Sequence, residues 1–241
     1  MIMLPSGISR HGTTFINWYL LEEAGKLTVI DAGFPTYWPQ LLQGIQERGY
    51  QLEDIQALIL THAHADHKGF AEGLRRATGV TVWVHEADRD LACRWEPIPP
   101  RGFIQNLWRP FVRSFFLEAT RDGAFSVPPL EKVSTFQDGD VLDVPGHPQV
   151  IHTPGHTPGE CVFYLPERET LFSGDTLVTA SLYNGHFGRP QLLANGLNHN
   201  TYQARRSLQK LERLGHVTML PGHGEPWSGD MEEAVRGAYH Q

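Results

Sequence analysis

The chain has 241 residues and a formal net charge of −7 at pH 7. This acidic balance argues against a nucleic-acid-binding protein, which usually presents a basic patch. No apolar run approaches the ~20 residues of a membrane span, and residues 1–10 lack the charged start and apolar stretch of a secretory signal. We therefore expect a cytoplasmic protein without nucleic-acid or membrane partners.

Strands and helices alternate along the first half of the chain. A helix is expected at residues 37–48, where apolar side chains recur at helical spacing and Gly49 provides a stop. Residues 55–60 form a continuous apolar run with the length of a buried strand. The other expected elements are strands at 13–21, 26–30 and 80–84 and helices at 68–77 and 86–91.

The second half of the chain repeats this alternation. Its expected strands are 132–136, 141–144, 149–152, 161–165, 170–172 and 217–220, and its expected helices are 200–214 and 229–239. Strands interspersed with helices in both halves predict stacked sheets covered by helices, in an α/β or α+β class.

Residues 94–130 depart from this pattern. They mix arginines with aromatic residues, among them Trp108, Phe111 and Phe115, and their prolines interrupt any single long helix. We expect a helical insertion, or lid, of one or two short helices lying on the core. Packing in the core and a dimer contact are the alternative roles for its aromatic side chains.

The hexapeptide His62-Ala63-His64-Ala65-Asp66-His67 directly follows the apolar run at 55–60. It offers three imidazoles and one carboxylate, the groups from which Zn²⁺ and similar ions take their ligands. Buried positions do not gather four polar groups without a metal or solvent to satisfy them. Because four such groups exceed what one tetrahedral ion normally takes from one loop, the hexapeptide predicts two metal ions.

Three further turns, each at the end of an expected strand, carry a metal-competent side chain beside glycine. They are Pro154-Gly155-His156, Ser173-Gly174-Asp175-Thr176 and Pro221-Gly222-His223-Gly224. Glycine lets the backbone turn tightly and approach an ion closely. Neither cysteine, Cys93 or Cys161, lies in these turns, which disfavours a structural zinc site.

The four motifs together offer seven candidate ligands that divide between two ions. His62 and His64, two residues apart in extended chain, point to the same side and can share one ion. Each ion would keep an open position, as catalytic metal sites do. One ion would take His62, His64 and His156; the other would take Asp66, His67 and His223; Asp175 would bridge them.

In this order and spacing, the motifs H-x-H-x-D-H, P-G-H, S-G-D-T and P-G-H-G resemble those of the metallo-β-lactamase-fold hydrolase superfamily. The resemblance implies one domain over residues 1–241, built as a four-layer αββα sandwich with the metal site along one edge between the sheets. It also implies the same division of ligands between two sites. Asp31 matches an early Asp of the family that supports the ligating histidines, although an ordinary Asp at a strand end is the alternative.

Differences between this sequence and particular branches of the superfamily reduce the number of expected activities. Asp175 stands where many true β-lactamases of this fold carry Cys or no ligand, which disfavours antibiotic hydrolysis. Because the sequence continues only to residue 241 after residues 221–224, we expect no helical C-terminal domain of the glyoxalase II type. Tyr183 is the nearest match, at a different offset, to a Tyr of some acyl-homoserine-lactone lactonases; core or loop packing is its alternative role.

These residues predict a binuclear metal-dependent hydrolase in which a metal-bridging hydroxide cleaves a small ester, thioester or lactone. Asp66 and Asp175 are the expected catalytic carboxylates, with Asp66 orienting the hydroxide and returning a proton to the leaving group. Tyr183, Trp108, Phe111 and Phe115 are the expected substrate contacts, and His11 lies in an expected loop near the pocket. Zinc is the favoured metal for both ions, with manganese or iron as alternatives.

Two other activities remain open at this point. Some members of the superfamily with similar ligands hold iron and oxidise sulfur compounds, so an iron-dependent oxidoreductase is the main alternative. A phosphodiesterase is disfavoured by the acidic composition. The partner in either case is a small-molecule substrate, and a homodimer is compatible with the sequence.

Overall fold

The computed structural model describes residues 1–4, 7–13, 15–95, 104–181, 185 and 187–239. Its first sheet has seven strands in chain order. Strands β1 to β4 pair antiparallel, and β4 to β7 pair parallel. They are β1 (Ile2–Met3), β2 (Ile8–Gly12), β3 (Asn17–Glu23), β4 (Lys26–Ile30), β5 (Ile55–Ile59), β6 (Thr81–His85) and β7 (Ser134–Phe136).

The second sheet has five strands in the order β14-β13-β10-β9-β8, and its neighbours β10 and β13 are parallel. These strands are β8 (Gln149–His152), β9 (Cys161–Leu165), β10 (Thr170–Gly174), β13 (His216–Pro221) and β14 (Trp227–Asp230). A separate antiparallel ribbon joins β11 (Val178–Ala180) to β12 (Phe187–Gln191).

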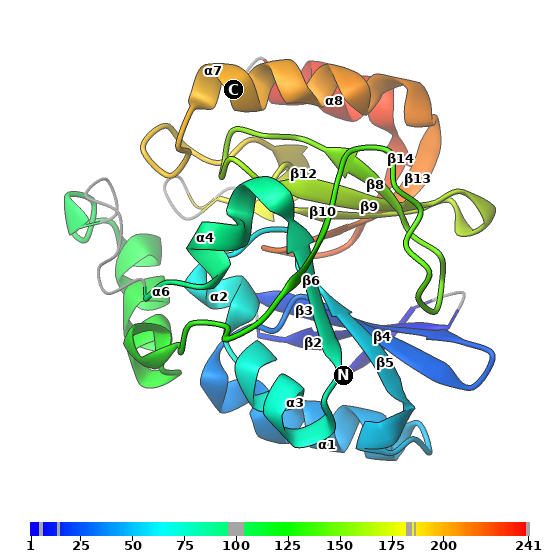
Figure 1. Cartoon of the computed structure of the whole chain (residues 1–241). Coiled ribbons are helices and arrows are strands. Elements are labelled where there is room, and N and C mark those ends of the chain that lie inside the picture. The colour runs from blue at the N-terminus through cyan, green and yellow to red at the C-terminus, as the bar shows by residue number, and fades with distance from the viewer. Residues whose placement is uncertain (5–6, 14, 96–103, 182–184, 186, 240–241) are drawn as a thin grey trace.

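Helices lie on the outer face of each sheet. The α-helices are α1 (Trp38–Glu47), α2 (Ala65–Lys68), α3 (Ala71–Thr78), α4 (Arg89–Ala92), α6 (Pro110–Arg121), α7 (Thr201–Ser207) and α8 (Met231–Tyr239). In Figure 1, α7 and α8 cover the second sheet and α1 and α3 cover the first, with the two sheets face to face between them. The four-layer αββα sandwich expected from the sequence is therefore confirmed.

Alternation of side chains along the strands builds this layered core. On β3, Trp18 and Leu20 pack toward the helices, whereas Tyr19 and Leu21 pack between the two sheets. This is the period of two that a strand imposes on its side chains. A third apolar layer, which includes Met231 of α8, fills the space between the second sheet and its helices.

The structure differs from the expected elements at several points. Strand β2 was not expected, because Ser9, Arg10 and His11 are polar, yet all three are buried. His11 therefore does not lie in a loop near the site; its ring stacks on Trp18 with centroids 4.2 Å apart. The strand expected at 13–21 begins only at Asn17, after a turn closed by a Thr13 N–H to Ile16 carbonyl bond.

Two expectations for the second half of the chain were also wrong in detail. Residues 141–144 form no strand apart from an isolated bridge between Val141 and Gln149. Pro145 has no N–H to donate, and Gly146 has φ of +92°, so the chain turns back at this point. The helix expected at 200–214 ends at Ser207 and continues as two 3₁₀ turns, Leu208–Lys210 and Glu212–Leu214.

Helix α6 lies within the segment expected to be an insertion, on the side of the sandwich where α2 and α4 lie (Figure 1). It is anchored by the buried Val112, which packs with Phe15 and Leu197. None of the helices in the described ranges is long and apolar enough to cross a membrane.

Candidate metal centre

The candidate ligands meet where two pairs of parallel strands end. Asp31 and the hexapeptide follow the neighbouring strands β4 and β5 of the first sheet. Asp175 and His223 follow the neighbouring strands β10 and β13 of the second sheet. Because the carboxyl ends of parallel neighbours lie at one edge of a sheet, these side chains reach the same end of the sandwich. Helix α2 adds Asp66 and His67 to them.

All seven expected ligands fall into three overlapping groups. Within each group the ligand atoms lie within 4.8 Å of one another. The groups are His62, His64 and His156; His62, His67 and Asp175; and Asp66, His67 and His223. The first and third groups match the two ligand sets expected from the sequence, and we call them the first and second ligand groups.

Asp175 lies between these two groups. Its Oδ2 is 3.3 Å from Nε2 of His156 in the first group and 3.2 Å from Nε2 of His223 in the second. Its Oδ1 is 3.5 Å from Nε2 of His67. One carboxylate therefore faces histidines of both groups, as a bridging ligand would.

The donor atoms of the centre fit divalent cations. Among the residues that the structure describes, the Nε2 atoms of His62 and His67 and the Oδ1 atom of Asp175 are buried without a hydrogen-bond partner. Buried polar atoms rarely remain unpaired, so a shared cation gives these atoms the partner that they lack. Imidazole nitrogen and carboxylate oxygen suit zinc, manganese and iron alike.

The two groups differ in their electrostatics. Burial, reinforced by the other imidazoles, holds the pKa of both His62 and His64 well below the usual range, so these rings are neutral and free to ligate. Burial also acts to lower the pKa of His67, but Asp31 and Asp175 outweigh it and raise that pKa to about 10. The second group is therefore an environment that favours positive charge.

Asp31 orients His67 by contacting the ring nitrogen that does not face Asp175. Its Oδ2 lies 2.9 Å from Nδ1 of His67, and its Oδ1 accepts a 2.8 Å hydrogen bond from the Thr61 N–H. Asp31 holds this position with φ of +58°, a conformation uncommon for residues other than glycine and often found at functional sites. The contact leaves Nε2 of His67 facing Asp175, which agrees with the supporting role expected for Asp31.

The turn that carries His223 is held by the first sheet. The Asn17 side-chain amide donates to the carbonyls of Pro221 and Gly224, at 2.9 and 2.7 Å. Nδ1 of His223 lies 2.5 Å from the Phe15 carbonyl. Because a carbonyl only accepts, Nδ1 carries the proton and Nε2 is left free toward the centre.

Residue 222 must be glycine because the ligands pack too closely around it to leave room for a side chain. A Cβ atom at this position would lie 2.6 Å from Oδ1 of Asp175 and 2.7 Å from Cε1 of His67. Such contacts are too short to be accommodated without moving a ligand. The glycine therefore sets how closely the His223 turn approaches the other ligands.

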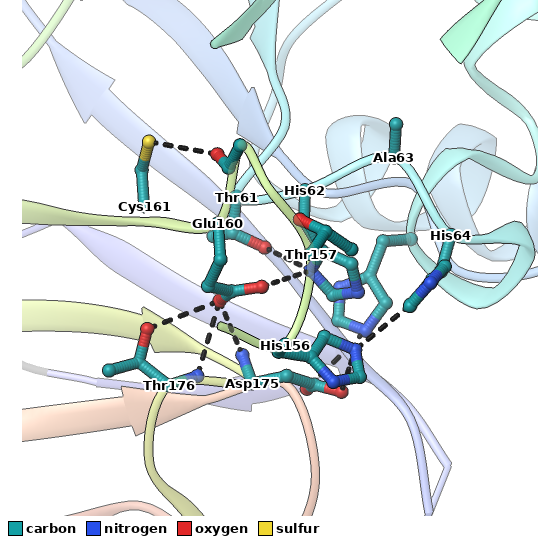
Figure 2. A network of polar contacts seen from close by, with 12 residues as sticks. Thr61, His62, Ala63, His64, His156, Thr157, Glu160, Cys161, Asp175 and Thr176 are labelled. Atoms are coloured by element: carbon teal, nitrogen blue, oxygen red, sulfur yellow. Dashed lines mark hydrogen bonds and ion pairs between the residues drawn. The ribbon is translucent and has the colours of Figure 1, made fainter. Parts of the chain in front are cut away.

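Two buried carboxylates at the centre were missed by the sequence reasoning. Glu160 is fully buried, with Oε2 3.1 Å from Nδ1 of His62 and Oε1 2.9 Å from the Asp175 N–H (Figure 2). Asp88 accepts hydrogen bonds from Ala63 and Thr157, which lie in the two loops of the first ligand group. The sequence did offer a signal for Glu160: it is a charged residue between a glycine turn and an apolar strand, and a charge buried at such a position needs partners.

The four expected substrate residues have different positions. The ring of Phe115 lies 6.1 Å from that of His223, between centroids, so helix α6 reaches the second ligand group. The ring of Phe111 packs edge-on at 5.6 Å against Phe187 of β12. Trp108 is 71% exposed, and its ring stacks with the guanidinium of Arg109, 4.8 Å away. Tyr183 lies outside the described residues.

Known proteins resemble this chain over most of its length. A family model of the metallo-beta-lactamase superfamily matches residues 11–223. The chain is 29% identical over 205 residues to the hydroxyacylglutathione hydrolase GloC of Haemophilus influenzae, covering 84% of this chain and 82% of the relative. It is 25% identical over 247 residues to the probable metallo-hydrolase YflN of Bacillus subtilis, covering 91% and 85%.

Solved structures agree with this similarity. The metallo-beta-lactamase family protein TTHA1429 from Thermus thermophilus is 27% identical with a TM-score of 0.68, covering 97% of this chain and 78% of its own. TTHA1623, solved in a di-iron-bound form, is 29% identical with a TM-score of 0.64, covering 97% and 98%. The shared fold thus extends over nearly the whole chain.

Proposed function

Because this chain belongs to the metallo-beta-lactamase superfamily, we propose that it is a binuclear metal-dependent hydrolase of a small ester, thioester or lactone. One observation carries the proposal: seven metal-competent side chains converge at one edge of the sandwich, and several of their buried donor atoms lack a partner. A closed structural site would not need ligands for two ions.

We assign the first ligand group to one ion, the second to another, and Asp175 to both. Zinc is the favoured metal, and the di-iron form of TTHA1623 supports iron as the alternative. When bound, the ions would act as Lewis acids and lower the pKa of a water molecule toward neutrality. The neutral rings of His62 and His64 suit such ligation, as does the negative surrounding of His67.

Asp66 is the carboxylate that we assign to proton transfer. Its side chain is 20% exposed, whereas that of Asp175 is 3% exposed. A group that returns a proton to a leaving group must be reached by substrate and solvent, and only Asp66 of the two meets this requirement. Its Oδ2 lies 3.6 Å from Nε2 of His223, so it stands beside the second ligand group. Asp175, enclosed between both groups, holds the ligands in place.

The aromatic side of the centre favours a substrate with an apolar part. Phe115 lies against His223, and Phe111 and Phe187 pair across helix α6 and strand β12. We propose that this aromatic wall, formed by Phe111, Phe115 and Phe187, contacts the acyl or alkyl portion of the substrate. Thioesters belong in the substrate class because GloC is a hydroxyacylglutathione hydrolase.

A hydrolysis screen with metal analysis of the same sample tests the proposal. The substrates are lactones, thioesters, aryl esters and bis-p-nitrophenyl phosphate. We expect turnover of a carboxylic ester or thioester by protein with two ions per chain, and loss of most activity in Asp175→Ala. The exposed Asp143→Ala is the matched control and retains activity. Full activity of Asp175→Ala would contradict the assignment of Asp175 to the metal centre. Faster turnover of the phosphodiester than of every carboxylic ester and thioester would make a phosphodiester the substrate class instead.

Iron-dependent oxidation of a sulfur compound is the second candidate, because a structural relative was solved with two irons. Purification without added metal distinguishes it from hydrolysis. One redox-active iron per chain, together with oxygen uptake on a persulfide and no ester turnover, would establish the oxidoreductase instead.

A further inference from the structure

We propose that Glu160 is a positioning residue that sets the ring orientation and protonation of His62 and also holds the turn of Asp175. The inference rests on the proposed metal centre, because it assigns the two side chains as ligands. Glu160 itself is not in any of the candidate ligand groups.

The surroundings of Glu160 are unusual for a carboxylate. Its side chain is fully buried directly before β9, and in the described part of the chain no Lys or Arg forms a salt bridge with it. A buried carboxylate without a cation is costly unless hydrogen bonds satisfy its oxygens. Oε1 accepts such bonds from the Asp175 turn, whereas Oε2 has no hydrogen-bond partner among the described residues and lies against the ring of His62.

One oxygen of Glu160 and the Thr61 hydroxyl both lie against Nδ1 of His62. Oε2 of Glu160 lies 3.1 Å from Nδ1 of His62 without a hydrogen bond between them, and the Thr61 hydroxyl, which donates to Asp31, lies 3.3 Å from the same Nδ1 and accepts from it. Nδ1 must therefore carry the proton, which leaves the lone pair on Nε2. Nε2 of His62 is the buried atom without a partner that faces the centre. A carboxylate behind a ligating histidine fixes the ring in this way.

The other oxygen of the same carboxylate holds the Asp175 turn. Oε1 accepts hydrogen bonds from the Asp175 N–H at 2.9 Å and from the Thr176 N–H at 3.2 Å. Figure 2 shows Glu160 between His62 on one side and this turn on the other. A Cβ on Gly174 would lie 2.6 Å from Oε1, so the turn approaches the carboxylate as closely as glycine allows.

The arrangement parallels that of Asp31 in the second ligand group. Asp31 is hydrogen-bonded to Nδ1 of His67 at 2.9 Å, and Glu160 lies 3.1 Å from Nδ1 of His62. Thr61 lies between the two pairs, because its hydroxyl donates to Asp31 and lies 3.3 Å from Nδ1 of His62. Each ligand group thus has one histidine oriented by its own buried carboxylate.

The substitution Glu160→Gln tests this role because it preserves shape and removes charge. If the new amide faces His62, it donates to Nδ1 and drives the ring proton to Nε2, where it blocks ligation. If the NH₂ group of the new amide faces Asp175 and Thr176, it meets two N–H donors and cannot accept from them. We expect zinc titration against a chelating dye to show two ions in the wild type. In the variant we expect roughly tenfold to hundredfold weaker binding of one ion.

Glu72→Gln is the matched control. Glu72 is also a buried glutamate, but its partners are Arg75 and Arg76, away from the centre. We expect this variant to bind both ions as the wild type does. Equal binding of both ions by Glu160→Gln would overturn the inference and leave the proposed function standing. A wild type that binds no ion would overturn the proposed function itself.

A measurement on the wild type covers the case in which Glu160→Gln does not fold. Long-range ¹H–¹⁵N spectra of the metal-free protein report which ring nitrogen of each histidine is protonated, and His62→Gln assigns the signal. A proton on Nδ1 of His62 supports the role of Glu160. A proton on Nε2 would overturn it.

Discussion

Asp88 accepts a 2.7 Å hydrogen bond from the hydroxyl group of Thr157, the residue that follows His156. The same oxygen accepts from the N–H of Ala63, between His62 and His64, at 3.1 Å. Its other oxygen accepts from the Gly159 N–H at 2.7 Å. Two loops from different sheets, which carry the whole first ligand group, are therefore joined by one fully buried carboxylate.

Replacing this carboxylate by Asp88→Ala is expected to weaken both the fold and the first ligand group. Three donors would lose their acceptor, and a buried unpaired donor costs about 1–3 kcal/mol. Urea unfolding of the metal-free protein should show a loss of at least about 3 kcal/mol on this basis, and chelator competition should show weaker binding of one ion. Asp90→Ala, on the exposed side of α4, is the control. Unchanged stability and metal binding would contradict the joining role.

Gly222→Ala is expected to damage the centre while leaving the fold intact. The added methyl group would lie 2.6 Å from Oδ1 of Asp175, so the His223 turn must move away from its partners. A shift of this kind commonly costs roughly a hundredfold in catalysis. The check is kcat/KM together with thermal unfolding of the metal-free protein.

Gly237→Ala provides the contrast for Gly222→Ala. Gly237 lies in helix α8 with open space where a Cβ would stand, so alanine should stabilise the helix by up to ~1 kcal/mol. Activity of Gly222→Ala equal to that of Gly237→Ala would show that the close approach at residue 222 is not needed.

Phe115→Ala is expected to change substrate preference more than the chemistry. If the ring contacts the apolar part of the substrate, its removal forfeits about 1.5–3 kcal/mol of burial. KM should rise for substrates with long acyl chains and change little for short ones, with kcat mostly retained. Trp108→Ala, at a ring 71% exposed, should leave both values near those of the wild type. An equal effect of Phe115→Ala on short and long chains would refute the contact.

The stability of the metal-free protein should depend on pH through His11. Burial, aided by the positive charges of the N-terminus and Arg48, lowers the pKa of His11 to about 3. The unfolded chain binds a proton below about pH 6.5 that the folded protein cannot bind. The contribution of His11 to the free energy of unfolding is thus fully present above pH 6.5 and is lost as the pH falls toward 3. One such group contributes a slope of about 1.4 kcal/mol per pH unit.

His11→Asn removes this titration and is compared with the wild type by urea unfolding between pH 7 and pH 4.5. We expect the difference in unfolding free energy between the two proteins to shrink as the pH falls. Parallel curves would show that His11 takes up a proton in the folded state as readily as in the unfolded one.

The layered fold and the candidate ligands were predictable because their signals are local. Apolar periodicity marks strands such as residues 55–60, and glycine turns at strand ends mark His156, Asp175 and His223. The hexapeptide holds four donors in adjacent positions, so no tertiary information was needed to single it out. Strand β2 escaped prediction because its buried Ser9 and Arg10 read as surface residues.

The supporting residues could not be identified in the same way. Asp88 and Glu160 are two of 27 acidic residues, and their partners lie in other loops. The order of the motifs also does not indicate which helix approaches the centre. Phe115 was one of four expected substrate contacts, and only its contact with His223 separates it from the exposed Trp108.

The sequence by itself determined the fold family and the identity of the candidate donors, since both follow from residue types at fixed spacing. Only the tertiary structure decided how the donors are held. Burial of a carboxylate and the choice of its hydrogen-bond partners depend on segments that meet through packing of the two sheets. That is why the sequence indicated a metal centre at the hexapeptide and a supporting role for Asp31, while Asp88 and Glu160 acquired their roles from the fold.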